Sequence, residues 1–183
     1  MLLKSSNCSL LIVDVQEKLF NKIFEYKILE NNILKVIDVC SILKVPIILS
    51  EQYPKGLGKT IPSIQKRLKL SSIKMFDKTT FSCFPEGIGG EICKNYLKTN
   101  QIILIGIETH ICILQTAFDL KDQGYEVFIV DEGVGSRQIN DKELAKTRFI
   151  QSGLKVINFE MMLFELIRDS KNDHFKELSK LLK

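Results

Sequence analysis

The chain is predicted to fold as a three-layer α/β sandwich, with helices on both faces of one parallel sheet of six strands. Short apolar segments alternate with longer segments whose apolar residues recur at helical spacing. The short segments are almost uninterrupted apolar runs, as expected for strands that are covered on both faces. For six such strands, numbered along the chain, we expect the doubly wound order 3-2-1-4-5-6.

The expected strands are short runs of aliphatic and β-branched residues. They cover residues 9–13, 45–50, 71–77, 101–106, 126–130 and 154–158. Helical spacing predicts helices over residues 27–44, 88–98, 111–123, 141–152, 159–169 and 173–182. Glycine, proline and polar residues predict loops over residues 51–62, 78–87 and 131–140.

Length and composition favour a single domain over residues 1–183. Hydrophobic residues make up 45% of the chain and charged residues 26%, which is typical of a globular protein. No apolar run approaches the ~20 residues that span a bilayer, and no secretory signal is recognisable. We therefore expect a cytoplasmic protein that has no membrane partner.

The net charge of +4 does not indicate nucleic-acid binding. The basic residues alternate with acidic ones, as in "KNDHFKELSKLLK", and no basic cluster with interleaved aromatic residues occurs. This pattern is typical of a solvated surface, so no nucleic-acid partner is expected.

The cysteines and histidines give no indication of a metal site. The five cysteines contain no CxxC pair and no zinc-type spacing, and the chain has only two histidines. We therefore expect free thiols, no metal and no cofactor. Cys8, Cys40 and Cys93 are interpreted as structural thiols, the last two because they fall inside predicted helices.

Three residues at predicted strand ends are candidates for chemistry: Asp14, Lys78 and Cys112. Sites in such sheets lie at the carboxyl ends of the strands, near the point where the strand order reverses. Here that point lies between the first and fourth strands, which end next to Asp14 and Cys112. The alternatives are a turn or capping acid for Asp14, a surface lysine for Lys78 and a small core residue for Cys112.

Cys112 has the best case for a nucleophile, because it lies where a strand leads into a helix. The unpaired N–H groups and the dipole of a helix N-terminus stabilise a thiolate, and the same groups can donate to an oxyanion. A lysine cation and an acceptor carboxylate nearby would add to the thiolate fraction. Cys83 is the rival, since it shares a predicted loop with Lys78, but no strand-to-helix turn serves it.

Several motifs follow one another along the chain: "LLIVDVQEKLF", "SEQYPKGLGKTIPSI", "FDKTTFSCF", "GIETHICILQTAFDL", "DEGVGSR" and "FIQSG". In this order they resemble the isochorismatase-like cysteine hydrolases over essentially the whole chain, and in particular the small isochorismatase-domain-containing proteins. The resemblance implies a Rossmann-like isochorismatase fold and a Cys–Asp–Lys triad formed by Cys112, Asp14 and Lys78.

The resemblance also implies how the triad acts. The aspartate takes the thiol proton, the lysine stabilises the thiolate, and attack on a carbonyl gives a thioester acyl-enzyme that water releases. A cis peptide at Ile107–Glu108 is implied as well, with the backbone N–H groups of Glu108 and Cys112 forming the oxyanion hole.

Departures from the family pattern narrow the expected chemistry. Nicotinamidase members carry an Asp-x-His metal motif after the second strand, whereas this chain has "SEQYPKG" there. Isochorismatases that cleave a vinyl ether do not need the cysteine, which this chain retains. We therefore predict a metal-independent hydrolase of a small carbonyl compound, most simply an amide.

Neighbours of the triad are the candidates for substrate binding: Gln16, Phe20, Gln52, Tyr53, Thr80, Phe81 and Ile111. Core packing remains the alternative for Phe20 and Phe81. His110 is interpreted as a turn residue rather than as a base.

The main alternative to an enzyme is a catalytically silent interaction protein on the same fold, since a fold does not fix a reaction. Nucleic-acid binding is a third possibility that rests only on the mild positive charge. A homo-oligomer is expected from the resemblance, and residues 158–167, "NFEMMLFELI", could form its contact or belong to the core.

Overall fold

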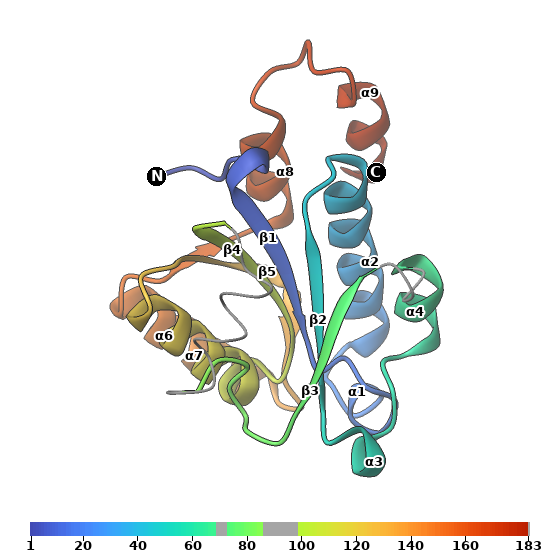
Figure 1. The fold of residues 1–183 in the computed structure, drawn as a ribbon, viewed down its shortest axis with the longest axis vertical. Coiled ribbons are helices and arrows are strands. Elements are labelled where there is room, and N and C mark those ends of the chain that lie inside the picture. The colour runs from blue at the N-terminus through green and yellow to red at the C-terminus, as the bar shows by residue number, and fades with distance from the viewer. Residues whose placement is uncertain (69–72, 86–98, 183) are drawn as a thin grey trace.

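The computed structural model describes residues 1–68, 73–85 and 99–182, and it contains the predicted sheet. Six parallel strands lie in the order β3-β2-β1-β4-β5-β6 (Figure 1). The strands are β1 (Cys8–Val13), β2 (Ile47–Gln52), β3 (Lys74–Lys78), β4 (Gln101–Ile107), β5 (Glu126–Gly135) and β6 (Lys155–Ile157). The fold class and strand order predicted from the sequence are thus confirmed.

Helices cover both faces of this sheet. They are α1 (Glu17–Phe20), α2 (Tyr26–Ile42), α3 (Pro54–Leu57), α4 (Pro62–Leu68), α6 (Leu114–Asp122), α7 (Ile139–Gln151), α8 (Phe159–Ile167) and α9 (Phe175–Leu178). Single turns of 3₁₀-helix, η1 (Ser5–Asn7) and η4 (Ser179–Leu182), lie near the two ends, and a π-helical turn, η3 (Thr109–Ile113), precedes α6.

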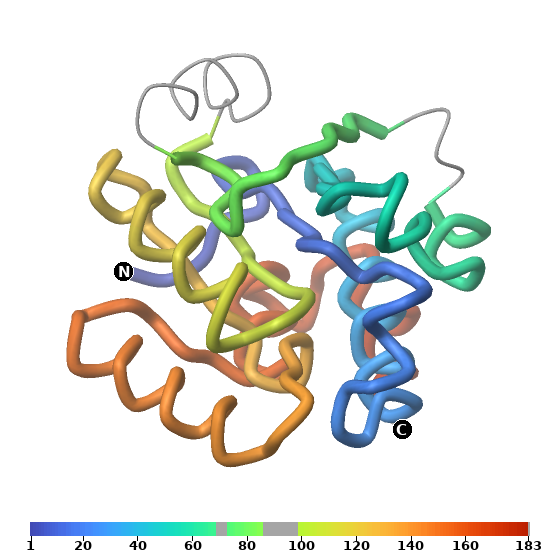
Figure 2. Tube along the Cα trace, turned by 90° about the horizontal axis from the view of Figure 1, so that it is seen from below, coloured from blue at the N-terminus to red at the C-terminus, as the bar shows by residue number. Residues whose placement is uncertain are grey.

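The strands divide their side chains between two cores, as period-two alternation requires. Leu10 and Ile12 of β1 pack with α2, α4 and α8, whereas Leu11 and Val13 pack with η3, α6 and α7. The view from below separates the two helical layers, with α6 and α7 on one side of the sheet and α2 and α4 on the other (Figure 2). The two layers leave the carboxyl ends of the strands as one edge, where the candidate residues emerge.

The predicted loop over residues 131–140 is wrong in its first half, because β5 continues to Gly135. A Cβ atom on Gly133 would lie 2.7 Å from Cγ2 of Ile105, and one on Gly135 would lie 2.6 Å from Cδ2 of Leu29. These glycines therefore leave space for packing against β4 and α2 rather than forming a turn.

Smaller differences between the prediction and the structure concern short helices. α1 and α3 are single turns too short to show helical periodicity, and α4 begins at the end of the predicted loop over residues 51–62. The predicted helix over residues 173–182 is divided into α9 and η4. The predicted helix over residues 88–98, which includes Cys93, lies outside the described residues.

The register of β1 brings the site residues together. Val13 pairs with Ser50 of β2 on one side and with Gly106 of β4 on the other. Gly106 has φ +125°, and a Cβ atom there would lie 2.1 Å from the carbonyl oxygen of Val13. Only glycine permits this close approach of β4 to β1, directly before the turn that carries Cys112.

Residues 158–167 belong mainly to the core. Met162, Leu163, Leu166 and Ile167 of α8 are buried, whereas Met161 and Phe164 are exposed by 46% and 41%. Within the described parts of the chain, no helix combines the length and the apolarity that crossing a membrane requires.

Candidate active site

Asp14 follows β1 directly and is held by the neighbouring strand. Its φ of +53° turns the chain away from the sheet, in a left-handed conformation that aspartate tolerates better than most residues. The backbone N–H of Asp14 donates to the carbonyl of Ser50 at 3.2 Å, and the hydroxyl of Ser50 donates to Oδ1 of Asp14 at 2.8 Å. The carboxylate is therefore fixed in a buried position at the point where the strand order reverses.

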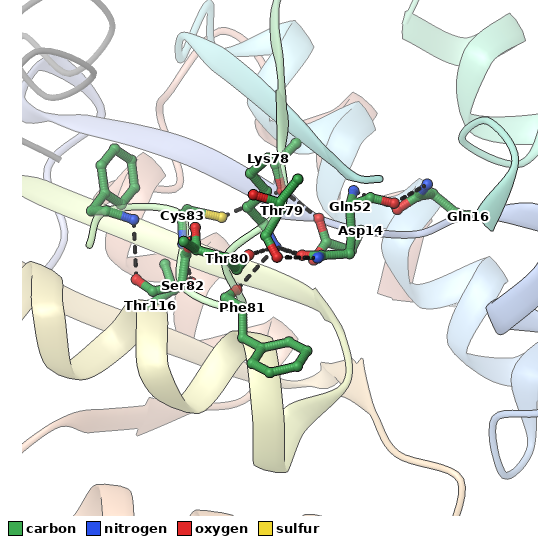
Figure 3. A network of polar contacts seen from close by, with 12 residues as sticks. Asp14, Gln16, Gln52, Lys78, Thr79, Thr80, Phe81, Ser82, Cys83 and Thr116 are labelled. Carbon is green, nitrogen blue, oxygen red and sulfur yellow. Dashed lines mark hydrogen bonds and ion pairs between the residues drawn. The ribbon is translucent and has the colours of Figure 1, made fainter. Parts of the chain in front are cut away.

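Lys78 ends β3 and reaches across β2 to the same carboxylate (Figure 3). Its Nζ lies 2.5 Å from Oδ2 of Asp14 and 2.7 Å from Oε1 of Gln52. It also donates to the carbonyls of Phe81 at 2.9 Å and Thr80 at 3.1 Å. The side chain of Lys78 is only 5% exposed, so this cation is neutralised inside the protein and is not a surface lysine.

Cys112 follows β4, which lies on the opposite side of β1 from the strand that carries Lys78. It lies in η3, which follows the cis peptide bond between Ile107 and Glu108, and its thiol is close enough to the Asp14 carboxylate for each group to shift the pKa of the other. The turn is closed by the carbonyl of Glu108, which accepts from the N–H groups of Ile111 and Ile113 at 3.1 and 3.2 Å. Asp14, Lys78 and Cys112 are thus brought together around one carboxylate.

Burial governs the proton affinities of this group. It raises the pKa of Asp14 above its ordinary value, although Lys78, Ser50 and Cys112 all act in the opposite direction. Burial also raises the pKa of Cys112, and the negative charge of Asp14 adds to this effect. Burial and the charge of Asp14 thus oppose the thiolate that the helix N-terminus favours, and the thiolate at Cys112 stays a prediction.

Cys83, the other candidate nucleophile, hydrogen-bonds to the hydroxyl of Ser50. Its Sγ donates to Oγ of Ser50 at 3.4 Å, and its backbone N–H donates to Oγ1 of Thr116 at 3.0 Å. Its side chain is 1% exposed, compared with 8% for Cys112, and burial raises its pKa to about 12. Cys83 is thus linked to the candidate base through the hydroxyl of Ser50.

An open cavity of about 450 Å³ lies beside Lys78. Its lining includes Tyr53, Lys55, Asp77, Lys78, Thr80 and Cys83, and Cys112 is not among the described residues that line it. Of the predicted substrate-binding residues, Tyr53 and Thr80 face this cavity. Phe81, exposed by 54%, adjoins Lys78 through its carbonyl, and Ile111 lies partly exposed next to Cys112.

Three predicted substrate-binding residues have internal contacts instead. Gln16 is fully buried, and its amide bonds the N–H and carbonyl of Gln52 at 2.7 and 3.0 Å and the carbonyl of Gly58 at 2.7 Å. Phe20 is 3% exposed and packs edge-on against Tyr26 in the core. Gln52 binds Lys78 and the carbonyl of Thr79, so its amide is already occupied.

Sequence reasoning missed Ser50 and Thr116, which hold the carboxylate and the Cys83 segment. Ser50 is a polar residue that ends an apolar strand, the same signal that pointed to Asp14. Thr116 carries no comparable signal inside an amphipathic helix. His110 bonds Oγ of Ser136 through Nδ1 at 3.0 Å, a link between η3 and the end of β5 that agrees with its interpretation as a turn residue.

Metal ligands are not grouped in the described part of the chain. No cluster of three or more histidine, cysteine, aspartate or glutamate side chains suited to an ion occurs among residues 1–68, 73–85 and 99–182. Independence from metals stays a prediction, which rests on the missing Asp-x-His motif.

Comparison with known proteins places this arrangement in a family. The model of the isochorismatase domain matches residues 8–161, which include every residue of the site. The chain belongs to the isochorismatase family. The family comprises isochorismatase-like hydrolases, which agrees with the resemblance seen in the motifs.

Curated members of the isochorismatase family cover nearly the whole chain. Isochorismatase family protein 1A of Dictyostelium discoideum is 38% identical over 95% of this chain and 85% of its own length. Isochorismatase domain-containing protein 2 of Danio rerio is 39% identical over 98% of this chain and 89% of its own length.

A solved structure that is similar to this chain is named for a different activity. "Structure of MAR1 Ribonuclease from Caenorhabditis elegans" superposes with a TM-score of 0.91 and 34% identity, covering 100% of this chain and 92% of that one. The names of the proteins that are similar to this chain therefore differ in the activity that they state.

Proposed function

We propose that the protein is a metal-independent cysteine hydrolase that cleaves a small carbonyl compound, most simply an amide. The observation that carries the proposal is the shared carboxylate: Asp14 contacts the ammonium of Lys78 at 2.5 Å and interacts with the thiol of Cys112. A nucleophile, a base of raised pKa and a buried cation within one network are what covalent catalysis at a carbonyl requires.

The first half of the proposed reaction forms a thioester. As Sγ of Cys112 attacks the carbonyl carbon, its proton passes to Asp14, so that the thiolate never has to form beforehand. The carbonyl oxygen becomes an oxyanion, for which we assign the backbone N–H groups of Glu108 and Cys112 as donors. The protonated Asp14 then gives its proton to the leaving amine as the C–N bond breaks.

The second half regenerates the enzyme. Asp14 takes a proton from water, the hydroxide attacks the thioester carbonyl, and Cys112 leaves with a proton returned from Asp14. The buried ammonium of Lys78 keeps the carboxyl able to lose its proton after each transfer, because it opposes the effect of burial on the Asp14 pKa. Tyr53, Thr80, Phe81 and Ile111 are the side chains we place around the substrate.

The proposal is tested by screening small primary amides for release of ammonia, with Cys112→Ala and Cys40→Ala as matched variants. Cys40 is buried in α2 and belongs to the other core, so its loss leaves the site intact. We expect turnover that is retained in Cys40→Ala and lost in Cys112→Ala, with a mass increase on Cys112 when the acyl-enzyme is trapped by acid. Turnover that survives in Cys112→Ala would contradict the proposal.

Cleavage of RNA is a second candidate, favoured by the name of the 34% identical MAR1 ribonuclease from Caenorhabditis elegans. The sequence-based expectation of no nucleic-acid partner is untested and stays a prediction. A fluorescently labelled RNA incubated with wild type and Cys112→Ala distinguishes the two candidates. Cleavage that is equal in both proteins would place a ribonuclease activity outside the proposed triad.

A catalytically silent protein remains the alternative outcome of these assays. It predicts no turnover on any amide or RNA and no trapped acyl group on Cys112. The small-molecule substrate, the cytoplasmic location and the homo-oligomer are proposals too. Light scattering coupled to size-exclusion chromatography tests the last of them.

A further inference from the structure

A second thiol is connected to the candidate base through a buried hydroxyl. Sγ of Cys83 donates to Oγ of Ser50 at 3.4 Å, and Oγ of Ser50 donates to Oδ1 of Asp14 at 2.8 Å. Both contacts have a fixed direction, since a hydroxyl that gives its only proton to the carboxylate can only accept from the thiol. Figure 3 shows Cys83 and Asp14 within the same network.

We propose that Cys83 and Ser50 are positioning residues that act as a buried donor chain, holding Asp14 in the orientation and charge state in which it accepts the Cys112 proton. This inference rests on the proposed function of Asp14 as the base. It assigns Cys83 a role other than that of a rival nucleophile.

The division of contacts on Asp14 supports this role. Ser50 occupies Oδ1, whereas Lys78 occupies Oδ2. With both oxygens engaged from different strands, the carboxylate cannot rotate without losing a contact. The thiol of Cys112 therefore meets an acceptor whose plane is fixed before any substrate arrives.

Burial strengthens the effect of the Cys83–Ser50 hydrogen bonds on Asp14. Ser50 is 0% exposed, and Asp14 and Cys83 are each 1% exposed, although Cys83 also borders the cavity beside Lys78. Charged hydrogen bonds in such surroundings are stronger than neutral ones, and an acceptor that loses its donor there is not compensated by water. Removing the Ser50 hydroxyl should therefore favour the protonated form of Asp14.

Cys83 is itself anchored on the helix that follows the nucleophile. Its backbone N–H donates to Oγ1 of Thr116 at 3.0 Å, and Thr116 lies four residues after Cys112. Residues separated by four positions lie on the same face of a helix. The chain thus links the loop after β3, the end of β2 and the segment that carries Cys112.

The test measures the rate at which iodoacetamide alkylates Cys112 across pH, located by mass spectrometry, in wild type, Ser50→Ala, Ser50→Thr, Cys83→Ala and Cys83→Ser. For Ser50→Ala we expect the acid limb of the profile to move up by about half to one pH unit, because one charged hydrogen bond is lost. Ser50→Thr keeps a hydroxyl and should restore the profile. Cys83→Ser keeps a donor and should resemble wild type, whereas Cys83→Ala should move the limb in the same direction as Ser50→Ala by a smaller amount.

Two comparisons keep the result interpretable. Thermal unfolding of each variant identifies a general loss of stability, and the Thr and Ser variants separate lost hydrogen bonding from lost packing. If Asp14→Asn slows alkylation but Ser50→Ala leaves the acid limb unmoved, the donor chain is wrong and the base assignment stands. If Asp14→Asn has no effect either, the proposed function of Asp14 fails with it.

Discussion

The ammonium of Lys78 lies 2.5 Å from Oδ2 of Asp14, and the two side chains are only 5% and 1% exposed. Lys78 comes from β3 and Asp14 from the end of β1, with β2 between them. A buried ion pair across three strands contributes little net stability, but it is costly to break on one side. We therefore infer that the ion pair between Asp14 and Lys78 serves catalysis rather than stability.

Removing the cation alone should destabilise the fold. Lys78→Met leaves the Asp14 carboxylate buried without its ion partner, and we expect a loss of about 3–5 kcal/mol in the free energy of unfolding. Urea denaturation measures it. The double variant Asp14→Asn/Lys78→Met removes both charges and should lose less than the two single variants added together. Additive losses would show that the two groups are not coupled.

The pH dependence follows from the direction of the Asp14 shift. Because burial raises the pKa of Asp14, the carboxyl stays protonated at pH values where an exposed aspartate has lost its proton. A protonated Asp14 cannot accept the Cys112 proton, so reactivity should fall as pH decreases, with a midpoint above the ~4 of an ordinary aspartate. Alkylation rates of Cys112 between pH 4 and 9 measure the midpoint. A midpoint at or below that ordinary value would contradict the buried site.

Gln16 should act on stability, because its amide satisfies three backbone groups of Gln52 and Gly58. Gln16→Ala leaves these groups without their partner, and each unsatisfied buried group costs about 1–3 kcal/mol. We expect a clear decrease in the melting temperature, measured by circular dichroism. Lys18→Ala provides a matched control, since Lys18 bonds the neighbouring Gly56 carbonyl at an exposed position. Equal effects of the two substitutions would refute the role of Gln16.

Gly106 should be intolerant of any side chain. In Gly106→Ala, the new Cβ would lie 2.1 Å from the Val13 carbonyl oxygen, so we expect a loss above about 4 kcal/mol or failure to fold. Gly124→Ala is the matched control: it also has a positive φ, of +88°, but nothing lies within 4 Å of its Cβ. That variant should lose only about 1–2 kcal/mol from backbone strain. Similar losses in both would mean that the close approach of β4 to β1 is unimportant.

The sequence predicted the sheet well because its signals are local. Short apolar runs marked the strands, a polar residue directly after β1 marked Asp14, and the carboxyl ends of parallel strands necessarily share an edge. The second half of β5, residues 131–135, was not predicted as strand, because glycine usually marks a turn. Gly133 and Gly135 instead allow close packing between residues that are distant in sequence. Such packing is visible only when β4 and α2 are in place.

Side-chain roles were predicted less well than positions. Gln16 and Phe20 lie near the site in sequence, but alternation and helix phase send them into the interior. The pKa of Cys112 depends on its tertiary surroundings for a related reason. A helix N-terminus argues for a thiolate, but desolvation and the charge of Asp14 oppose it, and both depend on tertiary burial.

The most direct test of the account is the rate of Cys112 alkylation by iodoacetamide in wild type and Asp14→Asn at neutral pH, with the modified cysteine located by mass spectrometry. The account predicts that Cys112 reacts before Cys83 and that Asp14→Asn slows it by about tenfold or more, because loss of the acceptor for the thiol proton outweighs removal of the charge that raises the Cys112 pKa. Alkylation of Cys83 first, or a Cys112 rate unchanged in Asp14→Asn, would contradict the account.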